Sequence, residues 1–228
     1  QGGKLQRIAG RTDGLDKKTA PNEKDERMEE MMIKVEHVEK QFKEVKVLKD
    51  INVCLERGKI HGLIGRNGSG KTVLMKCICG FMKPTAGSIT VAGKRVGKDV
   101  DIPQNLGVII EAPGFLPGYS GFKNLKFLAD IQKKADAARI TEVMERVGLD
   151  PASKKHVSKY SLGMRQRLGI AQAIMEDPDL LILDEPMNGL DNHGVEDIRA
   201  LLLSLKEEGK TILIASHSAE DIAVLCDT

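Results

Sequence analysis

The sequence is poor in aromatic residues and in net charge. Of its 228 residues only 3% are Phe, Tyr or Trp, and Trp is absent altogether. This composition argues against a platform on which nucleic-acid bases stack. The 35 basic and 33 acidic residues leave a net charge of +2. No strong electrostatic field therefore attracts nucleic acid or an anionic membrane surface.

Long apolar runs and metal-binding cysteine patterns are also missing. No hydrophobic stretch approaches the roughly 18 residues that a bilayer-spanning helix needs, and no secretory signal is visible. The cysteines fit no zinc-site spacing, and we expect them to be reduced thiols of a cytosolic protein; they are Cys54, Cys77, Cys79 and Cys226. A hydrophobic content of 41% suits one large domain, or a core with a small insert.

The amino-terminal segment differs from the rest in composition. Residues 1–30 hold seven Lys or Arg and seven Asp or Glu, and very little that is apolar. Such a segment buries too little surface to offset the entropy lost on ordering. We therefore predict a disordered leader or tail over residues 1–31, followed by the folded domain over residues 32–228.

A glycine-rich phosphate-binding motif is the most informative stretch, with the form Gly-x-x-x-x-Gly-Lys-Ser/Thr. It follows an apolar run, Ile60 to Ile64, and precedes a helical pattern, which is the context this motif requires. Glycines let successive N–H groups point at an anion, and the helix N-terminus adds positive charge. The sequence predicts nucleotide binding here, the alternative being a glycine-rich turn with no ligand; the predicted residues are Gly65, Arg66, Asn67, Gly68, Ser69, Gly70, Lys71, Thr72 and Val73.

Within this motif two side chains have distinct predicted roles. Lys71 places a mobile cation on the β- and γ-phosphates, and the Thr72 hydroxyl ligates Mg²⁺. The predicted cofactors are accordingly ATP and Mg²⁺.

A second conspicuous stretch is an apolar run that ends in two acids. Leu180–Leu183 reads as a buried parallel strand, and Asp184 and Glu185 follow at its carboxyl end. We predict that Asp184 holds the Mg²⁺ shell and that Glu185 takes a proton from the attacking water. The alternative is a solvated acidic pair at the turn before Pro186.

Two further polar side chains follow predicted strands. His217 ends the run Thr211–Ser216, and Glu111 ends the run Leu106–Ile110. Ligands of α/β sheets bind at the carboxyl ends of parallel strands. His217 is therefore a candidate for a hydrogen bond to the γ-phosphate, and Glu111 for a Mg²⁺ ligand. The alternatives are a structural histidine and an exposed loop acid.

The remaining patterns predict the parts around this core. Strands are expected near residues 33–38, 45–55 and 88–91, with Phe42 either capping a small sheet or stacking on an adenine ring. Helical spacing over residues 121–132 and 138–147 predicts a helical insert of about residues 113–160. Ser161 is a good N-cap for the next helix, whose N–H groups could bind an anion or be simply capped. The expected fold is α/β: a P-loop NTPase parallel-sheet core with an N-terminal antiparallel β subdomain and a helical insert.

These pieces, in this order, resemble the nucleotide-binding domain of ATP-binding cassette (ABC) transporters, from about Met32 to the C-terminus. The resemblance implies Walker A at residues 65–72 and Walker B at residues 180–184, with Glu185 as the catalytic carboxylate. It further implies a D-loop at residues 188–191, which includes Asp191, a switch histidine at His217, and Phe42 as the adenine-stacking aromatic.

Ser161-Leu162-Gly163-Met164 stands where the family has its Ser-Gly-Gly-Gln signature. Leu162 and Met164 depart from that pattern. The Ser161 hydroxyl and the Gly163 N–H remain, and we expect both to reach the γ-phosphate bound by a partner subunit.

Glu111 falls where the family usually has a glutamine. The surrounding residues 110–115 are similar to the subgroup that exports bacitracin and lantibiotics for self-protection. The resemblance implies an ATP-hydrolysing subunit that powers export of antimicrobial peptides or drugs. Its partners would be a separate integral membrane permease and a second ATP-binding subunit, in a homodimer, on the cytoplasmic face of the cell membrane. The family's usual sequence continues past Thr228, so we expect a truncated C-terminus.

Other classes of function remain as alternatives. ABC-type ATPases that act on nucleic acid or ribosomes generally show tandem cassettes, long coiled coils or zinc insertions, and this sequence shows none. A P-loop kinase or GTPase would leave the Ser161 segment unexplained, and the guanine motif Asn-Lys-x-Asp is absent. Glu185 and His217 together disfavour a binding module without enzymatic activity.

Overall fold

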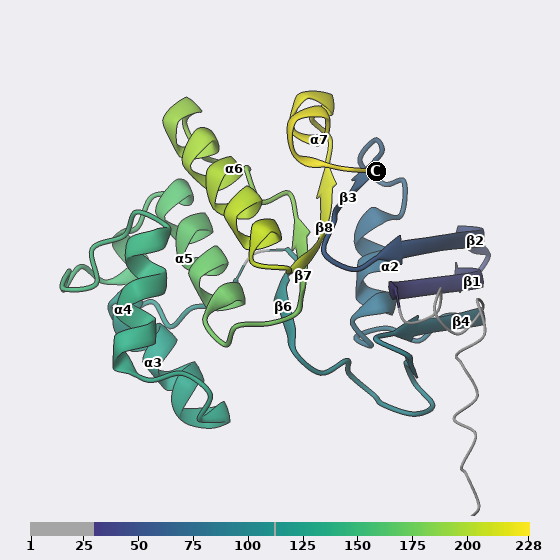
Figure 1. Ribbon diagram of the computed structural model, residues 1–228, viewed down its shortest axis with the longest axis horizontal. Coiled ribbons are helices and arrows are strands. Elements are labelled where there is room, and N and C mark those ends of the chain that lie inside the picture. Colours follow the sequence, from purple (N-terminus) through teal and green to yellow (C-terminus); the bar gives the residue numbers. More distant parts are fainter. Residues whose placement is uncertain (1–29, 112) are drawn as a thin grey trace, which may run out of the picture.

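The structure is a computed structural model that describes residues 30–111 and 113–228 (Figure 1). Most of the predicted disordered segment, residues 1–31, lies outside the described residues. Its last residue, Met31, opens the first strand.

An antiparallel sheet begins the described chain. It contains β1 (Met31–Phe42), β2 (Val45–Glu56), β4 (Ala86–Val91) and β5 (Lys94–Arg95), in the order β2-β1-β4-β5. β1 is longer than the predicted strand over residues 33–38. Its register with β2 shifts several times between Val35 and Gln41, and such irregularities break the alternation that sequence patterns rely on.

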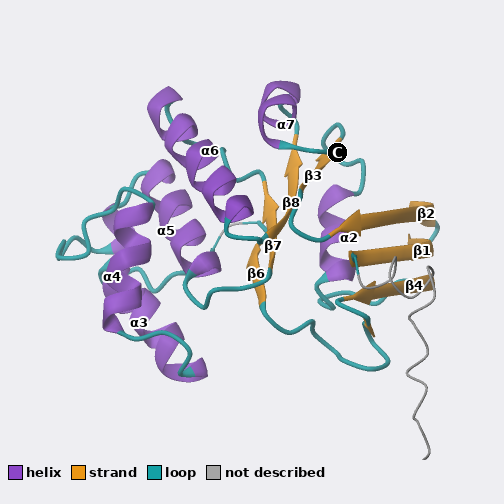
Figure 2. Ribbon diagram, in the orientation of Figure 1, coloured by secondary structure: helices purple, strands orange, loops and turns teal. Residues whose placement is uncertain are grey.

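A parallel sheet forms the centre of the molecule (Figure 2). It contains β3 (Ile60–Ile64), β6 (Leu106–Ile109), β7 (Leu180–Asp184) and β8 (Thr211–Ser216), in the order β3-β8-β7-β6. All four strands match the predicted runs to within a residue. Because β7 and β8 are buried on both faces, their continuous apolar runs identify them from sequence.

Helices cover both faces of the parallel sheet. On one face α2 (Lys71–Ile78) packs with the antiparallel sheet around a core that includes Ile182 and Leu213. On the other face α5 (Leu162–Ile174), α6 (Asn192–Glu207) and α7 (Ala219–Leu225) pack against Leu181 and Ile214. These observations confirm the predicted α/β class with one parallel and one antiparallel sheet.

The predicted helical insert corresponds to α3 (Gly121–Gln132), α4 (Ala137–Arg146) and the short 3₁₀ helix η1 (Val157–Lys159). α3 and α4 lie at the far side of α5 from the sheet (Figure 1) and share its core through Leu125 and Val143. The boundaries at residues 113 and 160 stay a prediction.

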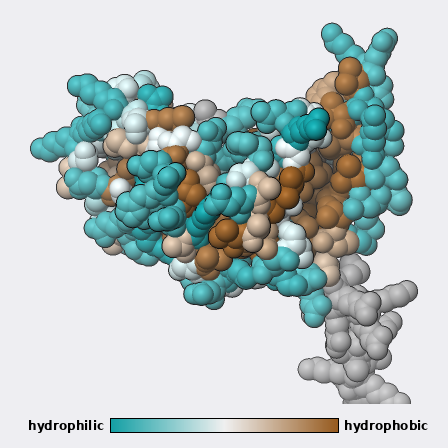
Figure 3. All heavy atoms as spheres, turned by 90° about the horizontal axis from the view of Figure 1, so that it is seen from above, coloured by the Kyte–Doolittle hydropathy of each residue, from teal (hydrophilic) through white to brown (hydrophobic). Residues whose placement is uncertain are grey.

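The surface and the thiols are unexceptional. Hydrophobic residues reach the surface in separate patches between larger hydrophilic areas (Figure 3). All four cysteines are free, and burial raises the pKa of Cys79 to about 12. Within the described residues, no helix has the length and apolarity to cross a bilayer.

Candidate active site

The phosphate-binding motif folds into a loop between β3 and α2. Gly68 and Gly70 have φ angles of 81° and 97°, the left-handed region that glycine adopts without steric cost. At Gly65 a Cβ atom would come within 2.5 Å of Ser69 Oγ. The backbone angles of Gly68 and Gly70 and the short contact at Gly65 thus favour glycine at these three positions. Arg66 to Ser69 lie exposed at the surface.

Lys71 and Thr72 open α2 directly after this loop. The Lys71 ammonium donates to the carbonyl of Gly65 at 2.6 Å. The Thr72 hydroxyl donates to Asp184 Oδ2 at 2.7 Å, across 112 residues of sequence. The fold thus joins the phosphate loop to the acidic end of β7. Val73 follows on α2, half-buried.

The Thr72–Asp184 pair fits the chemistry of a magnesium site. A hydroxyl and a carboxylate are the hard oxygen donors that Mg²⁺ prefers, and phosphate sites commonly supply only one or two protein ligands. Among the described residues no group of three or more His, Cys, Asp or Glu side chains could hold a metal. A protein-only metal cage is thus not formed there, and phosphate oxygens would have to complete the shell.

Glu185 and His217 meet at the ends of β7 and β8. Glu185 Oε2 lies 2.7 Å from His217 Nδ1, and the side chains are 24% and 66% exposed. The N–H of Glu185 donates to the carbonyl of Ala215 at 2.8 Å. The neighbouring parallel strands therefore bring these two candidates into direct contact.

Asp184 and Glu185 open onto one shared hollow. This catalytic hollow has a volume of about 380 Å³. It is lined by Glu111, Pro113, Leu162, Arg165, Gln166, Asp184, Glu185 and Asn188. A carboxylate that could act as a base and a carboxylate beside the Thr72 hydroxyl thus face the same space.

Gln166 is a site residue that sequence reasoning missed. Its Nε2 donates to the carbonyls of Glu185 and Pro186, at 3.3 and 3.1 Å. The residue lies on α5, in the segment noted only for the cap at Ser161. No local signal in the sequence connects it to a turn 19 residues further on.

Glu111 lines the catalytic hollow, but its carboxylate pairs with Lys76 of α2 at 2.6 Å. Its backbone has φ 61°, a left-handed conformation that is uncommon for a residue other than glycine. The Lys76 contact was not predicted.

Two helix caps line a separate hollow of about 510 Å³. Ser161 Oγ accepts from the N–H of Met164 at the start of α5, and Asp191 Oδ1 accepts from the N–H of Gly194 at the start of α6. A Cβ atom on Gly163 would come within 2.9 Å of the Gly189 carbonyl oxygen. The start of α5 therefore packs directly on the loop before Asp191.

Phe42 ends β1 opposite Val45 and is 41% exposed. The ammonium of Lys40 lies 5.1 Å from the centre of its ring. A partly exposed aromatic ring thus lies at the hairpin end of β1, and its stacking on adenine stays a prediction.

Comparison with known proteins identifies the family. The family model described as ABC transporter matches residues 48–188. The ABC transporter ATP-binding protein YybJ of Bacillus subtilis (strain 168) is 48% identical over 86% of this chain and 90% of its own length. The bacitracin transport ATP-binding protein BcrA of Enterococcus faecalis is 42% identical, over 87% of this chain and 65% of the relative. The chain thus spans slightly less than two thirds of BcrA. The lantibiotic transport ATP-binding protein SrtF of Streptococcus pyogenes is 37% identical over 86% of this chain and 84% of the relative.

Solved structures share the fold. The dimeric structure of MJ0796, a bacterial ABC transporter cassette, superposes with a TM-score of 0.77 at 24% identity, covering 85% of this chain and 91% of that one. The structure of cbiO1 from Clostridium perfringens, part of the ABC transporter complex cbiONQ, gives 0.75 at 29% identity, covering 87% and 83%. Family, relatives and fold favour a role in transport over the nucleic-acid alternative. The chain belongs to the ABC transporter family, as an ATP-binding and ATP-hydrolysing component.

Proposed function

We propose that this chain hydrolyses magnesium-ATP to power export through a separate integral membrane permease. The observation that carries the proposal is the convergence of the Thr72–Asp184 and Glu185–His217 pairs at one edge of the parallel sheet, beside the phosphate loop.

The residues divide the chemistry between them. The loop N–H groups and Lys71 bind the phosphates, with the ammonium exchanging its carbonyl partners for phosphate oxygens. Thr72 and Asp184 would hold Mg²⁺, which offsets negative charge on the β- and γ-phosphates when bound. Phe42 stacks on adenine.

Glu185 acts as the general base. It takes a proton from water as the water oxygen bonds to the γ-phosphorus and the bond to the β-phosphate oxygen breaks, which yields ADP and inorganic phosphate. His217 keeps the carboxylate in place through their 2.7 Å contact and donates to a γ-phosphate oxygen.

A second copy of the chain completes each site. In this homodimer the Ser161 hydroxyl, the Gly163 N–H and Asp191 of one copy approach the ATP held by the other. Leu162, 63% exposed, lies in the same surface. A cassette of the same fold that was solved as a dimer is consistent with pairing of two copies. ATP then stabilises the closed dimer and its hydrolysis releases it.

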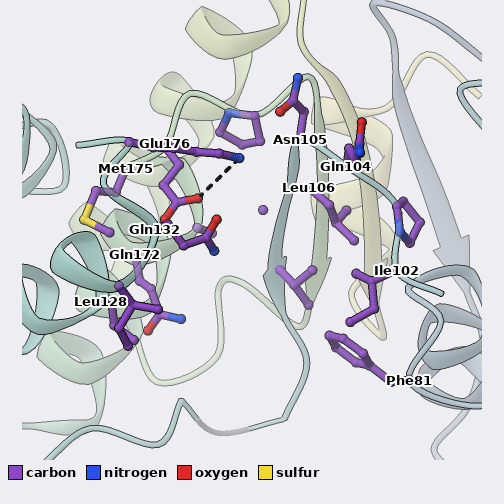
Figure 4. A pocket seen from close by; sticks show the side chains of 17 residues that line it. Phe81, Ile102, Gln104, Asn105, Leu106, Leu128, Gln132, Gln172, Met175 and Glu176 are labelled. Carbon is purple, nitrogen blue, oxygen red and sulfur yellow. Dashed lines mark ion pairs between the residues drawn. The ribbon is translucent and has the colours of Figure 1, made fainter. Parts of the chain in front are cut away.

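A groove with a mixed apolar and polar lining is the proposed docking place for the permease (Figure 4). The groove has a volume of about 680 Å³ and separates α3 from β6 and the segment before it; its lining includes Phe81, Ile102, Leu106, Leu128, Ile131 and Gln172. Phe81, Ile102 and Ile131 are 55%, 54% and 77% exposed. Several exposed apolar side chains around one groove are typical of an interaction surface. A membrane-embedded partner would hold the chain on the cytoplasmic face of the membrane.

Antimicrobial peptides are the proposed cargo. Support comes from two relatives, a bacitracin and a lantibiotic transport ATP-binding protein. The similarity of residues 110–115 to the subgroup that exports such peptides points the same way. Expression of this chain with its permease should raise the bacitracin concentration that a sensitive host survives. An unchanged survival for bacitracin and for a lantibiotic would reject this cargo.

Replacing Glu185 with Gln tests the hydrolytic part. Binding of a fluorescent ATP should stay intact, while ATP turnover falls about 10²-fold or more because the base is lost. Lys71→Met is the matched comparison, since it should weaken binding itself. Near-normal turnover in the Glu185→Gln variant would show that another group takes the proton.

A further inference from the structure

The ion pair between Lys76 and Glu111 connects two parts of the molecule. Lys76 lies on α2, four residues after Thr72 and therefore on the same face of the helix, one turn on. Its ammonium is 2.6 Å from Glu111 Oε1. The helix that presents Lys71 and Thr72 to the phosphates is thus tied to the loop that follows β6.

Glu111 stands between two hollows. It lines the catalytic hollow together with Asp184 and Glu185. It also lines a second hollow of about 390 Å³, together with Lys76, and this space shares Phe81, Val108 and Gln172 with the proposed permease groove. Lys76 lines only the second of the two. The ion pair therefore holds the carboxylate on the side of the second hollow.

The ion pair between Lys76 and Glu111 is weak enough to be replaced by another interaction. The Lys76 and Glu111 side chains are 26% and 66% exposed, and a partly exposed ion pair contributes little to stability. Glu111 also holds its left-handed backbone at φ 61°, a conformation that persists only while surrounding contacts maintain it. A modest competing interaction is enough to release the carboxylate.

Resting on the proposed function, we propose that Lys76 is a positioning residue for Glu111. Lys76 holds the Glu111 carboxylate on the side of the second hollow, and loss of their contact lets the carboxylate turn into the catalytic hollow, where it would add one oxygen donor to those that would hold Mg²⁺.

The test measures how much Mg²⁺ contributes to nucleotide binding, independently of turnover. Dissociation constants of a fluorescent ATP are measured in EDTA and in Mg²⁺, in a Glu185→Gln background where ATP is not consumed. The measured quantity is the dissociation constant in EDTA divided by that in Mg²⁺. Lys76→Met should raise this ratio by about two- to fivefold, which is the range expected when one exposed ion pair no longer competes for the Glu111 carboxylate. Lys76→Arg, which preserves the pair, should leave the ratio unchanged.

A double-mutant cycle separates this role from simpler ones. In a Glu111→Gln background, Lys76→Met should no longer change the ratio, because no carboxylate is left to release. An equal change in both backgrounds would mean that Lys76 acts directly on the phosphates, and would overturn the proposal. Altered thermal stability with an unchanged ratio would mean that Lys76 has only a structural role in the last turn of α2. This result would also overturn the proposal.

Lys126→Met is the matched control. It breaks an exposed ion pair with Asp130 on α3, at 3.0 Å, and should leave the ratio unchanged. No binding of the fluorescent ATP to the parent protein would overturn the proposed function together with this inference. Binding with an unaltered ratio in Lys76→Met would overturn the inference alone.

Discussion

Glu185, the proposed general base, has a backbone that is held in an unfavourable conformation. Its φ of 51° lies in the left-handed region, and Pro186 restricts it further. Three contacts hold this peptide: the N–H bonds Ala215, and Gln166 bonds the carbonyls of Glu185 and Pro186. These hydrogen bonds maintain the strained backbone of Glu185, and this backbone places the Glu185 carboxylate beside His217 rather than in solvent.

Gln166→Leu should therefore lower the rate of ATP hydrolysis without changing the affinity for ATP. The variant removes both donated hydrogen bonds while keeping a side chain of similar size. About 1 kcal/mol of lost positioning predicts a roughly fivefold lower kcat with an unchanged dissociation constant for ATP. Steady-state kinetics and ATP-binding titrations measure the two effects. Gln172→Leu, six residues further along α5 and in the lining of the groove, is the control. An equal loss of kcat there would show a general effect on the helix.

Sequence reasoning at this scale finds residues that carry their own signal. Glycines in the phosphate loop, and acids that end an apolar run, are recognisable without a fold. Gln166 and Lys76 are not, because each acts on a residue 19 or 35 positions away. Such partners become visible only when α5 and α2 are placed against the strand ends.

At the scale of elements, the edge of the parallel sheet is closed by the last described residues. Asp227 accepts from the N–H of Ile60 through its side chain and donates its own N–H to the Ile60 carbonyl. His61, only 3% exposed, bonds the hydroxyl of Thr228. Lys206 of α6 pairs with the Asp227 carboxylate. β3, which leads into the phosphate loop, is thus fixed along an otherwise open edge.

The Asp227 contacts predict a pH-dependent stability. The hydrogen bond from Lys206 lowers the pKa of Asp227 below its ordinary value of 3.8, with help from the Ile60 N–H. A lowered folded-state pKa stabilises the protein fully above 3.8, and this contribution is lost as the pH falls through the folded-state value. Asp227→Asn should cost about 1 kcal/mol at pH 7, and the deficit should narrow below pH 3.8.

Urea unfolding of both proteins between pH 7 and pH 3 measures this difference. Asp101→Asn, at an exposed position, is the control and should be neutral at both ends of the range. A deficit that stays constant with pH would assign the effect to packing rather than to the ionised carboxylate.

Elements differ in how well their sequences reveal them. Buried β7 and β8 and helix α3 were predicted to within a residue, since their patterns are continuous. The irregular register of β1 hid half of that strand. α6 and α7 were not predicted at all, although Asp191 and Ser218 cap them through side-chain bonds to Gly194 and Asp221.

At the scale of the whole molecule, the site is an outcome of topology. Adjacent β3, β8 and β7 place the phosphate loop, His217 and the two acids along one sheet edge. That meeting could be predicted from the family resemblance and from the rule for parallel strands. The groove could not be predicted from sequence. It forms between α3 and β6, and no single segment of the chain has a pattern that indicates it.

The groove yields the last prediction, which concerns the coupling of ATP hydrolysis to a membrane partner. Ile131, on α3, is 77% exposed at the rim of the groove. Ile131→Glu should leave the fold and the ATPase activity of the isolated chain unchanged, because the side chain contributes little to the core. It should weaken association with the permease by about 10-fold or more, since burying an Ile contributes roughly 1.5–3 kcal/mol. Copurification of tagged permease from detergent extracts measures the association.

Val224→Glu provides the matched control for this prediction. Val224 is a 51% exposed apolar residue on α7, an element far from α3 in Figure 1, and its substitution adds the same charge to the same total surface. If both variants lost the permease equally, added negative charge would be the cause and the groove would not be the docking place. If only Ile131→Glu lost it, peptide resistance should fall while ATP hydrolysis by the isolated chain continues, which separates the docking surface from the site of chemistry.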